Sequence, residues 1–146
     1  MEYANNPKAS FDYEILETLE AGIVLKGYEV KSIKTGKVSI KGSYVKILNG
    51  EPFLVGATIS PYQIANTPPD YDPQRSRKLL LSKKQISVLV GTSQAHGLTL
   101  VPLKLYNKKG LVKLLIGIAR GKKKYDKRET IKKKDAARAK QRGLEE

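Results

Sequence analysis

The sequence predicts a mainly β protein with some helix: a small closed antiparallel β-barrel, flanked by two or three helices and followed by a basic C-terminal tail. Three observations predict it. Apolar and polar residues alternate in several short segments, and Gly-containing turns join two pairs of these segments into hairpins. From residue 120 onward, nearly half of the positions are Lys or Arg. Short antiparallel strands need closure or covered edges, which a barrel capped by helices provides.

The strands are predicted from period-two alternation. The first strand begins at Phe11 and runs to Leu19, and Glu17 interrupts its apolar side. Its apolar face is expected to hold Phe11, Tyr13, Ile15 and Leu19. Two hairpins are predicted, one over 44–55 with its turn at 49–51 and one over 98–118 with its turn at 107–110. Residues 79–81 form a further short apolar strand. These strands make the oligonucleotide-binding barrel the nearest structural analogue.

Two helices are predicted between the strands. Ser82 and Gln85 have the spacing of a capping box, and the apolar residues that follow share one helical face until Gly97. A shorter helix is expected between residues 26 and 34, with Gly36 as its C-cap.

The chain divides into three parts by composition: an N-terminal arm over 1–10, a barrel domain over 11–119 and a basic tail over 120–146. The stretch 60–77 contains four prolines and is expected to be a long surface loop. The tail has too few large aliphatic residues to build a core, so we expect it to be disordered alone. Its alanines near residue 137 favour a helix once a partner is bound.

The charge of the chain predicts a polyanionic partner. The formal net charge is +14, and clustered Lys and Arg displace counterions from a phosphate backbone. An anionic membrane surface would attract the same charge, but no apolar run approaches the roughly 20 residues that span a bilayer, and residues 1–10 are too polar for a signal peptide. We therefore expect a cytoplasmic protein that works without a membrane.

Nothing in the sequence predicts catalysis, a metal or a cofactor. The chain has no cysteine and a single histidine, His96, which lies where a helix is expected to end and is more typical of a helix cap than of a catalytic base. No nucleophile elbow, phosphate-binding loop or metal-ligand spacing is present. We expect neither catalytic residues nor metal ligands, and no cofactor.

Four segments of the chain carry a recognisable pattern: LEAGI at 19–23 with LKGYEVKSIKTGK at 25–37, DPQRSRKLLL at 72–81, GLTLVPLKLY at 97–106 and GIARGKKKYDKR at 117–128. In order and spacing they resemble the SmpB family, the SsrA-binding proteins of bacteria. The resemblance implies a non-enzymatic adaptor that binds transfer-messenger RNA (tmRNA) at its tRNA-like domain and delivers it to stalled ribosomes for trans-translation. It also implies that the barrel replaces the anticodon arm, while the tail becomes helical and occupies the decoding centre and the empty mRNA channel. We expect the adaptor to be a monomer.

The resemblance assigns two sets of contacts. The residues expected to bind tmRNA are Asn6, Lys8, Glu20, Lys31, Arg75, Arg77 and Lys78. The residues expected at the ribosomal decoding centre are Gly121, Lys122, Lys123, Tyr125, Asp126, Lys127 and Arg128. Glu20 is the one acidic residue in the set expected to bind tmRNA. Because a carboxylate repels phosphates, Glu20 should accept hydrogen bonds from RNA groups or orient a neighbouring cation.

Two alternatives share the same composition. A ribosomal structural protein that binds rRNA would also combine a barrel, a basic tail and a cytoplasmic location. A ribonuclease acting on the stalled message would have a similar charge, and would depend on His96 or on the carboxylates.

Overall fold

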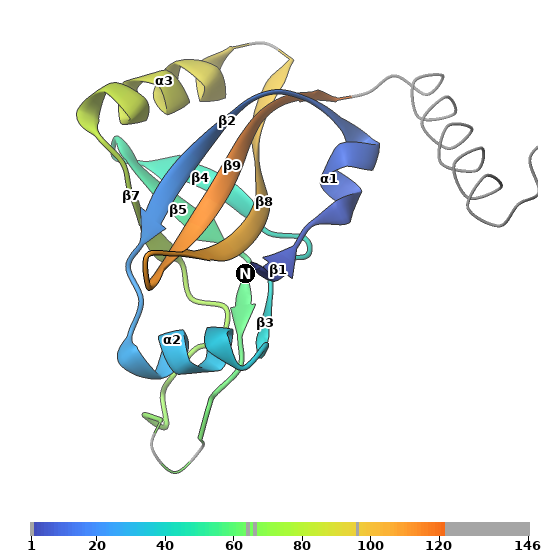
Figure 1. Ribbon diagram of the computed structural model, residues 1–146. Helices are drawn as coiled ribbons and strands as arrows, with labels where there is room; N and C mark the ends of the chain where they lie inside the picture. Colours follow the sequence, from blue (N-terminus) through green and yellow to red (C-terminus); the bar gives the residue numbers. More distant parts are fainter. Residues whose placement is uncertain (1, 64, 66, 96, 122–146) are drawn as a thin grey trace, which may run out of the picture.

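The computed structural model describes residues 2–63, 65, 67–95 and 97–121 of the chain. Its strands and helices alternate irregularly along the sequence (Figure 1). In chain order they are β1 (Glu2–Asn5), α1 (Pro7–Asp12), β2 (Tyr13–Ile23), α2 (Gly27–Lys34), β3 (Val38–Ser39), β4 (Tyr44–Leu48), β5 (Glu51–Val55), β6 (Thr58–Ile59), β7 (Arg77–Leu80), α3 (Lys83–Gln94), β8 (Leu98–Lys108) and β9 (Leu111–Gly121).

Seven strands form one antiparallel sheet in the order β1-β8-β9-β2-β7-β5-β4, and β3 pairs with β6 in a separate ribbon. The protein is mainly β with helices, as predicted. Strands β1 and β4 are the two ends of the large sheet, so in the described part of the chain its hydrogen bonds do not close a barrel. The sheet is strongly curled (Figure 1), and this brings its edge strand β4 close to β8.

The main core fills the inside of this curl. It is built from alternate residues of the long strands and from one face of each of α2 and α3, and its fully buried members include Ile33, Leu54, Leu89, Leu114 and Ile116. Helices α3 and α2 lie at opposite ends of the curled sheet (Figure 1). Helix α1 covers one part of the outward face of the long strands β8, β9 and β2, and the rest of that face is left for other contacts.

A β-bulge in β2 changes which face its residues occupy. Ile15 pairs with Ala119 and Glu17 pairs with Ile118, so one extra residue is inserted between them. The predicted single apolar face is therefore wrong. Tyr13 and Ile15 pack on the outer face in a small cluster with Ala9, whereas Leu19 packs inward against the main core. The interruption at Glu17 marks the place where the strand changes sides.

The N-terminal residues are part of the sheet and not a separate arm. Strand β1 pairs with β8, and α1 covers the outer cluster through the buried Ala9. Phe11, predicted at the start of the first strand, lies in α1 instead. Pro7 at the first helical turn fits this start, because its missing N–H would have no partner there.

The predicted helices and hairpins are confirmed. Ser82 caps α3: its side chain accepts a hydrogen bond from the Gln85 N–H at 3.2 Å. Both hairpins turn through two residues of positive φ, Asn49 and Gly50 in one and Lys109 and Gly110 in the other. This pair of left-handed residues is the mirror-image turn that matches the twist of neighbouring strands.

Candidate nucleic-acid interface

The outer face of β8, β9, β2 and β7 carries a row of residues set by the strand register. Tyr106, Lys113, Gly22 and Leu80 lie side by side across the four strands. Leu80 is 53% exposed, so its side chain lies on the surface and not in the core. A Cβ on residue 22 would approach the Leu80 Cβ to 3.2 Å, and glycine at this position lets the leucine side chain lie over β2.

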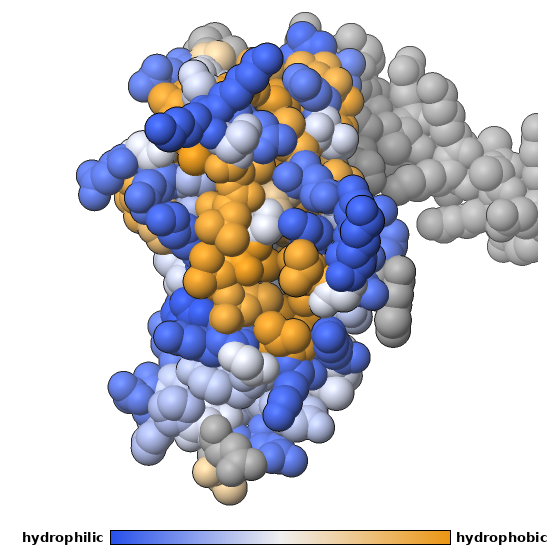
Figure 2. Space-filling view, turned by 60° about the vertical axis from the view of Figure 1, so that its left-hand side comes forward, coloured by the Kyte–Doolittle hydropathy of each residue, from blue (hydrophilic) through white to orange (hydrophobic). Residues whose placement is uncertain are grey.

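Next to Leu80 the surface is hollowed and apolar. A groove of about 220 Å³ runs between the β8–β9 turn and the start of α2, and its lining includes Leu25, Val30, Leu80 and Leu111. Leu111 is 60% exposed. A hydrophobic band bordered by hydrophilic residues is visible on this side of the molecule (Figure 2). An exposed apolar band with a polar rim is typical of an interaction surface.

Cations and one acid flank this groove. The Glu20 carboxylate accepts hydrogen bonds from the Tyr106 hydroxyl and from Lys108 Nζ, the latter at 3.2 Å. The hydrogen bond from Tyr106 is the main reason that the pKa of Glu20 lies below its ordinary value. Burial, followed by the bond to Glu20, raises the pKa of Tyr106 to about 12. At neutral pH the phenol is therefore protonated and donates to an ionised carboxylate.

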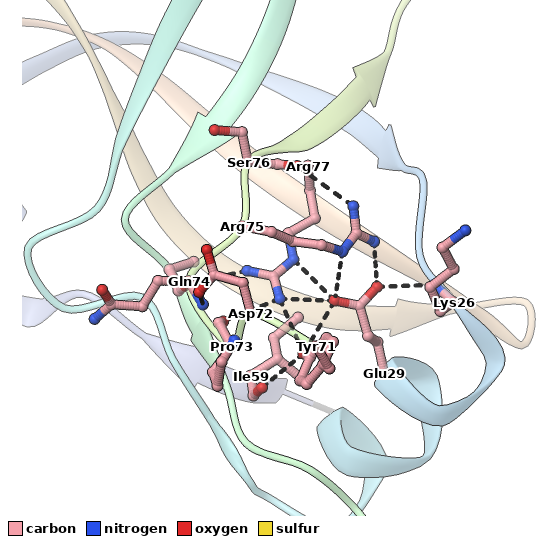
Figure 3. Close-up of polar contacts among 11 residues, drawn as sticks. Lys26, Glu29, Ile59, Tyr71, Asp72, Pro73, Gln74, Arg75, Ser76 and Arg77 are labelled. Carbon is pink, nitrogen blue, oxygen red and sulfur yellow. Dashed lines mark hydrogen bonds and ion pairs between the residues drawn. The ribbon is translucent and has the colours of Figure 1, made fainter. Parts of the chain in front are cut away.

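A second polar cluster is buried between α2 and the segment that leads into β7 (Figure 3). Glu29 and Arg77 have no exposed side-chain surface, and Arg77 Nη2 lies 2.7 Å from Glu29 Oε2. Arg75 also pairs with Glu29. The Tyr71 hydroxyl lies 2.7 Å from the Ile59 carbonyl oxygen and 3.2 Å from the Glu29 carboxylate, so its single proton is shared between these two acceptors. We call Glu29, Tyr71, Arg75 and Arg77 the Glu29 cluster.

The Glu29 cluster is internally satisfied. Burial alone would raise the pKa of Glu29, but the hydrogen bonds from Arg75, the Lys26 N–H and Arg77 outweigh it and hold that pKa below its ordinary value. Arg77 also donates to the carbonyls of Ala57 and Pro73, at 2.9 Å and 3.0 Å. These bonds fix the base of the predicted loop 60–77 to α2. The predicted RNA contact at Arg77 is not compatible with this arrangement, because its guanidinium is buried and committed to protein acceptors.

The other predicted tmRNA contacts are scattered over the surface. Lys8 is exposed and lines a groove of about 320 Å³ between α1 and β8, and Asn6 lines it too while its amide donates to the Pro102 carbonyl at 2.9 Å. Lys31 is exposed on α2, and Lys78 on β7 lies 3.4 Å from Glu51. The structure brings Arg75 and Arg77 together, but Glu20 lies in a separate cluster.

Gly121, at the end of β9, pairs with Tyr13 and is exposed. The remaining predicted decoding-centre residues, Lys122, Lys123, Tyr125, Asp126, Lys127 and Arg128, lie outside the described residues, and so does His96.

Sequence reasoning missed Tyr106, Lys108 and Lys113 as members of the outer face. Their signal was present: Lys104, Tyr106 and Lys108 stand at every second position of β8, so they share one side of the strand. Glu29 was missed as well. A lone acid in a short helix gives no signal of a pairing with arginines 46 and 48 residues away.

Over the described residues, no group of three or more metal-ligating side chains occurs. In the same part of the chain no helix is long and apolar enough to cross a membrane.

The fold and the outer face define a class: small, strongly basic, mainly β proteins whose exposed sheet surface combines cations with apolar side chains. Comparison with known proteins narrows it. The SmpB protein family model matches residues 3–146. The SsrA-binding protein of Bacillus pumilus is 57% identical, covering 92% of this chain and 86% of its own length. That of Shouchella clausii is 54% identical, covering 98% and 91%.

A solved structure agrees with these sequence relatives. A chain described under "tmRNA-SmpB: a journey to the center of the bacterial ribosome" is 50% identical, with a TM-score of 0.66 and coverage of 97% of this chain and 96% of that chain. The chain described here belongs to the SmpB family.

Proposed function

We propose that this protein binds tmRNA at its tRNA-like domain and delivers it to stalled ribosomes for trans-translation, in the cytoplasm where ribosomes work. The observation that carries this proposal is the likeness over nearly the whole chain to a structure described as tmRNA-SmpB in the ribosome, at 50% identity. Relatives named SsrA-binding protein support it.

The outer face is the surface we propose for tmRNA. An RNA loop presents phosphates, unstacked bases and riboses to a protein. The outer face offers lysines that can bind the phosphates and an apolar groove that can receive the bases or riboses. Among the predicted contacts, Glu20 belongs directly to this face, and Lys78 stands two residues before Leu80 on the outward side of β7. For Asn6, Lys8 and Lys31 the RNA contact stays a proposal from family resemblance.

For Arg75 and Arg77 we propose an indirect role. Their guanidinium groups bind Glu29 and fix the chain that leads into β7. Strand β7 carries Lys78 and Leu80, so the Glu29 cluster would position the outer face without touching RNA.

Several finer features belong to the same proposal. The curled sheet acts as a barrel, with β4 packed against β8 in place of hydrogen-bonded closure. The protein has no catalytic activity and acts as a monomer. Residues 120–146 occupy the decoding centre and the mRNA channel, where Gly121 begins the contact and Tyr125 offers a ring that can stack on a base.

The test is recovery of the tagged full-length protein from a bacterial lysate, followed by sequencing of the bound RNA. We expect one dominant tmRNA, together with enrichment of the protein on ribosomes stalled by a message without a stop codon. A protein present in equal amounts on all ribosomes, with rRNA as its bound RNA, would contradict the adaptor and favour a structural ribosomal protein. RNA cleavage by the purified protein would favour the ribonuclease.

A further inference from the structure

Tyr106 and Lys108 meet Glu20 by reaching over a strand that lies between them. Glu20 projects from β2, whereas Tyr106 and Lys108 project from β8, and β9 separates the two strands in the sheet. Glu20 is aligned with Leu115 of β9, and Tyr106 is aligned with Lys113. The hydrogen bonds therefore run diagonally across β9 and hold the tyrosine ring and the lysine against the outer face.

The ring of Tyr106 also lies close to a lysine. Lys104 Nζ lies 5.4 Å from the centroid of the Tyr106 ring, a distance at which an ammonium is attracted by the face of an aromatic ring. One side chain thus touches both the acid and a cation of the outer face. Lys108 bonds to both oxygens of Glu20, at 3.2 and 3.3 Å.

We propose that Tyr106 is a positioning residue for RNA binding: its hydroxyl holds Glu20, Glu20 holds Lys108, and the Tyr106–Glu20–Lys108 unit presents its cations to RNA in a preformed arrangement. This inference rests on the proposed function. It gives the acid of the outer face an indirect role, because both Glu20 oxygens already accept hydrogen bonds from protein donors.

The physical reason is the entropy of long cationic side chains. A lysine on an open surface loses rotamer freedom when it binds a phosphate, and this loss of entropy weakens binding. A lysine already held beside Glu20 has lost part of that freedom in the free protein. Glu20 therefore helps a cation to bind RNA although its own charge repels phosphate.

The experiment uses the full-length chain and the tRNA-like domain of tmRNA transcribed in vitro. Tyr106→Phe keeps the ring and the contact with Lys104 but removes the hydroxyl. We expect it to weaken RNA binding about three- to tenfold, the range of a single hydrogen bond, with an unchanged melting temperature. Tyr62→Phe is the matched control: Lys37 Nζ lies 5.9 Å from the centroid of the Tyr62 ring, Tyr62 lines neither groove, and its change should leave the affinity unaltered.

A double-mutant cycle separates positioning from direct contact. If Glu20 acts through this unit, Tyr106→Phe should have little further effect in a Glu20→Ala background, where the hydroxyl has lost its acceptor. Additive losses would overturn the proposal, and so would wild-type affinity in Tyr106→Phe. Ultraviolet titration of the free protein checks the bond itself, since Glu20→Gln should lower the pKa of one tyrosine from about 12.

The outcomes distinguish this inference from the proposed function. If the wild-type protein fails to bind the tRNA-like domain, the proposed function fails. If it binds and the two changes behave as independent sites, only the role of Tyr106 fails.

Discussion

The Glu29 cluster allows a quantitative prediction about stability, because the chain contains a matched exposed pair. Glu29 and Arg77 have no exposed side-chain surface, whereas Glu14 and Arg120 pair at 2.9 Å with more than half of each side chain exposed. Glu29→Gln and Glu14→Gln make the same chemical change in two different environments. Burial and the larger number of hydrogen-bond donors around Glu29 separate their expected effects.

The expected magnitudes differ severalfold. Removing one partner of a buried ion pair leaves an uncompensated charge and costs about 3 to 5 kcal/mol, and here Arg75 would lose its carboxylate as well. An exposed pair contributes about 0 to 1 kcal/mol. Against a total stability of about 5 to 15 kcal/mol for a domain, Glu29→Gln should remove a large fraction and Glu14→Gln a small one.

Urea unfolding at pH 7 measures both changes. With an m-value of about 1.5 to 2 kcal/mol/M, Glu29→Gln should lower the midpoint by about 1.5 to 3 M, and Glu14→Gln by about 0.5 M or less. In 1 M salt the effect of Glu14→Gln should vanish and that of Glu29→Gln should persist, since burial limits screening. Equal midpoints for the two variants would refute the argument that the Glu29 cluster holds the fold.

Four further predictions concern the pH dependence of the Glu29 cluster, the outer face and the tail. Ionised Glu29 has a pKa below the ordinary 4.5, so its stabilisation is fully present above that value and is lost as the pH falls through the folded-state pKa; acid unfolding curves of Glu29→Gln should lack this loss. Leu80→Ser, at an exposed position, should weaken RNA binding while the free energy of unfolding changes by about 0.5 kcal/mol or less; a stability loss like that of Glu29→Gln would mean that Leu80 supports the fold. Replacing Lys108 and Lys113 by Gln should reduce the slope of log affinity against log salt by about 1.4 to 1.8 units, and an unchanged slope would remove both from the phosphate contacts. Truncation after Gly121 should keep the melting temperature and bind the tRNA-like domain within about tenfold, yet abolish tagging of polypeptides stalled on a message without a stop codon; near-normal tagging would make the tail a passive appendage.

The helix start and the hairpin turn that depend on neighbouring residues were predicted from short sequence patterns. The capping box at Ser82 and Gln85 marked the start of α3, and the turn residues Asn49 and Gly50 marked the tip of a hairpin. These signals work because the residues that cause the structure stand within a few positions of one another. The class of partner followed from the charge.

The sequence shows one sign of the bulge in β2, the polar residue Glu17 on the apolar side of the strand, but the alternation of residues does not show that the strand changes face there. Tyr13, Ile15 and Leu19 keep period two in the sequence, which predicts a shared face. The extra residue exists only in the pairing with β9, where Ile15 meets Ala119 and Glu17 meets Ile118. Whether a polar residue interrupts a face or marks a change of face depends on the partner strand.

The arginines show why site residues are harder to predict than folds. Arg75, Arg77 and Lys78 stand together in one basic run, and the family resemblance assigns all three to RNA contact. Their environments differ because successive side chains of β7 lie on opposite faces of the sheet. Arg77 points inward to Glu29, while Lys78 points outward and is 45% exposed. The buried acid that captures Arg77 comes from another element, 48 positions earlier. A charge run therefore predicts a polyanionic partner, but the pairing of strands and helices decides which of its cations remain free to meet that partner.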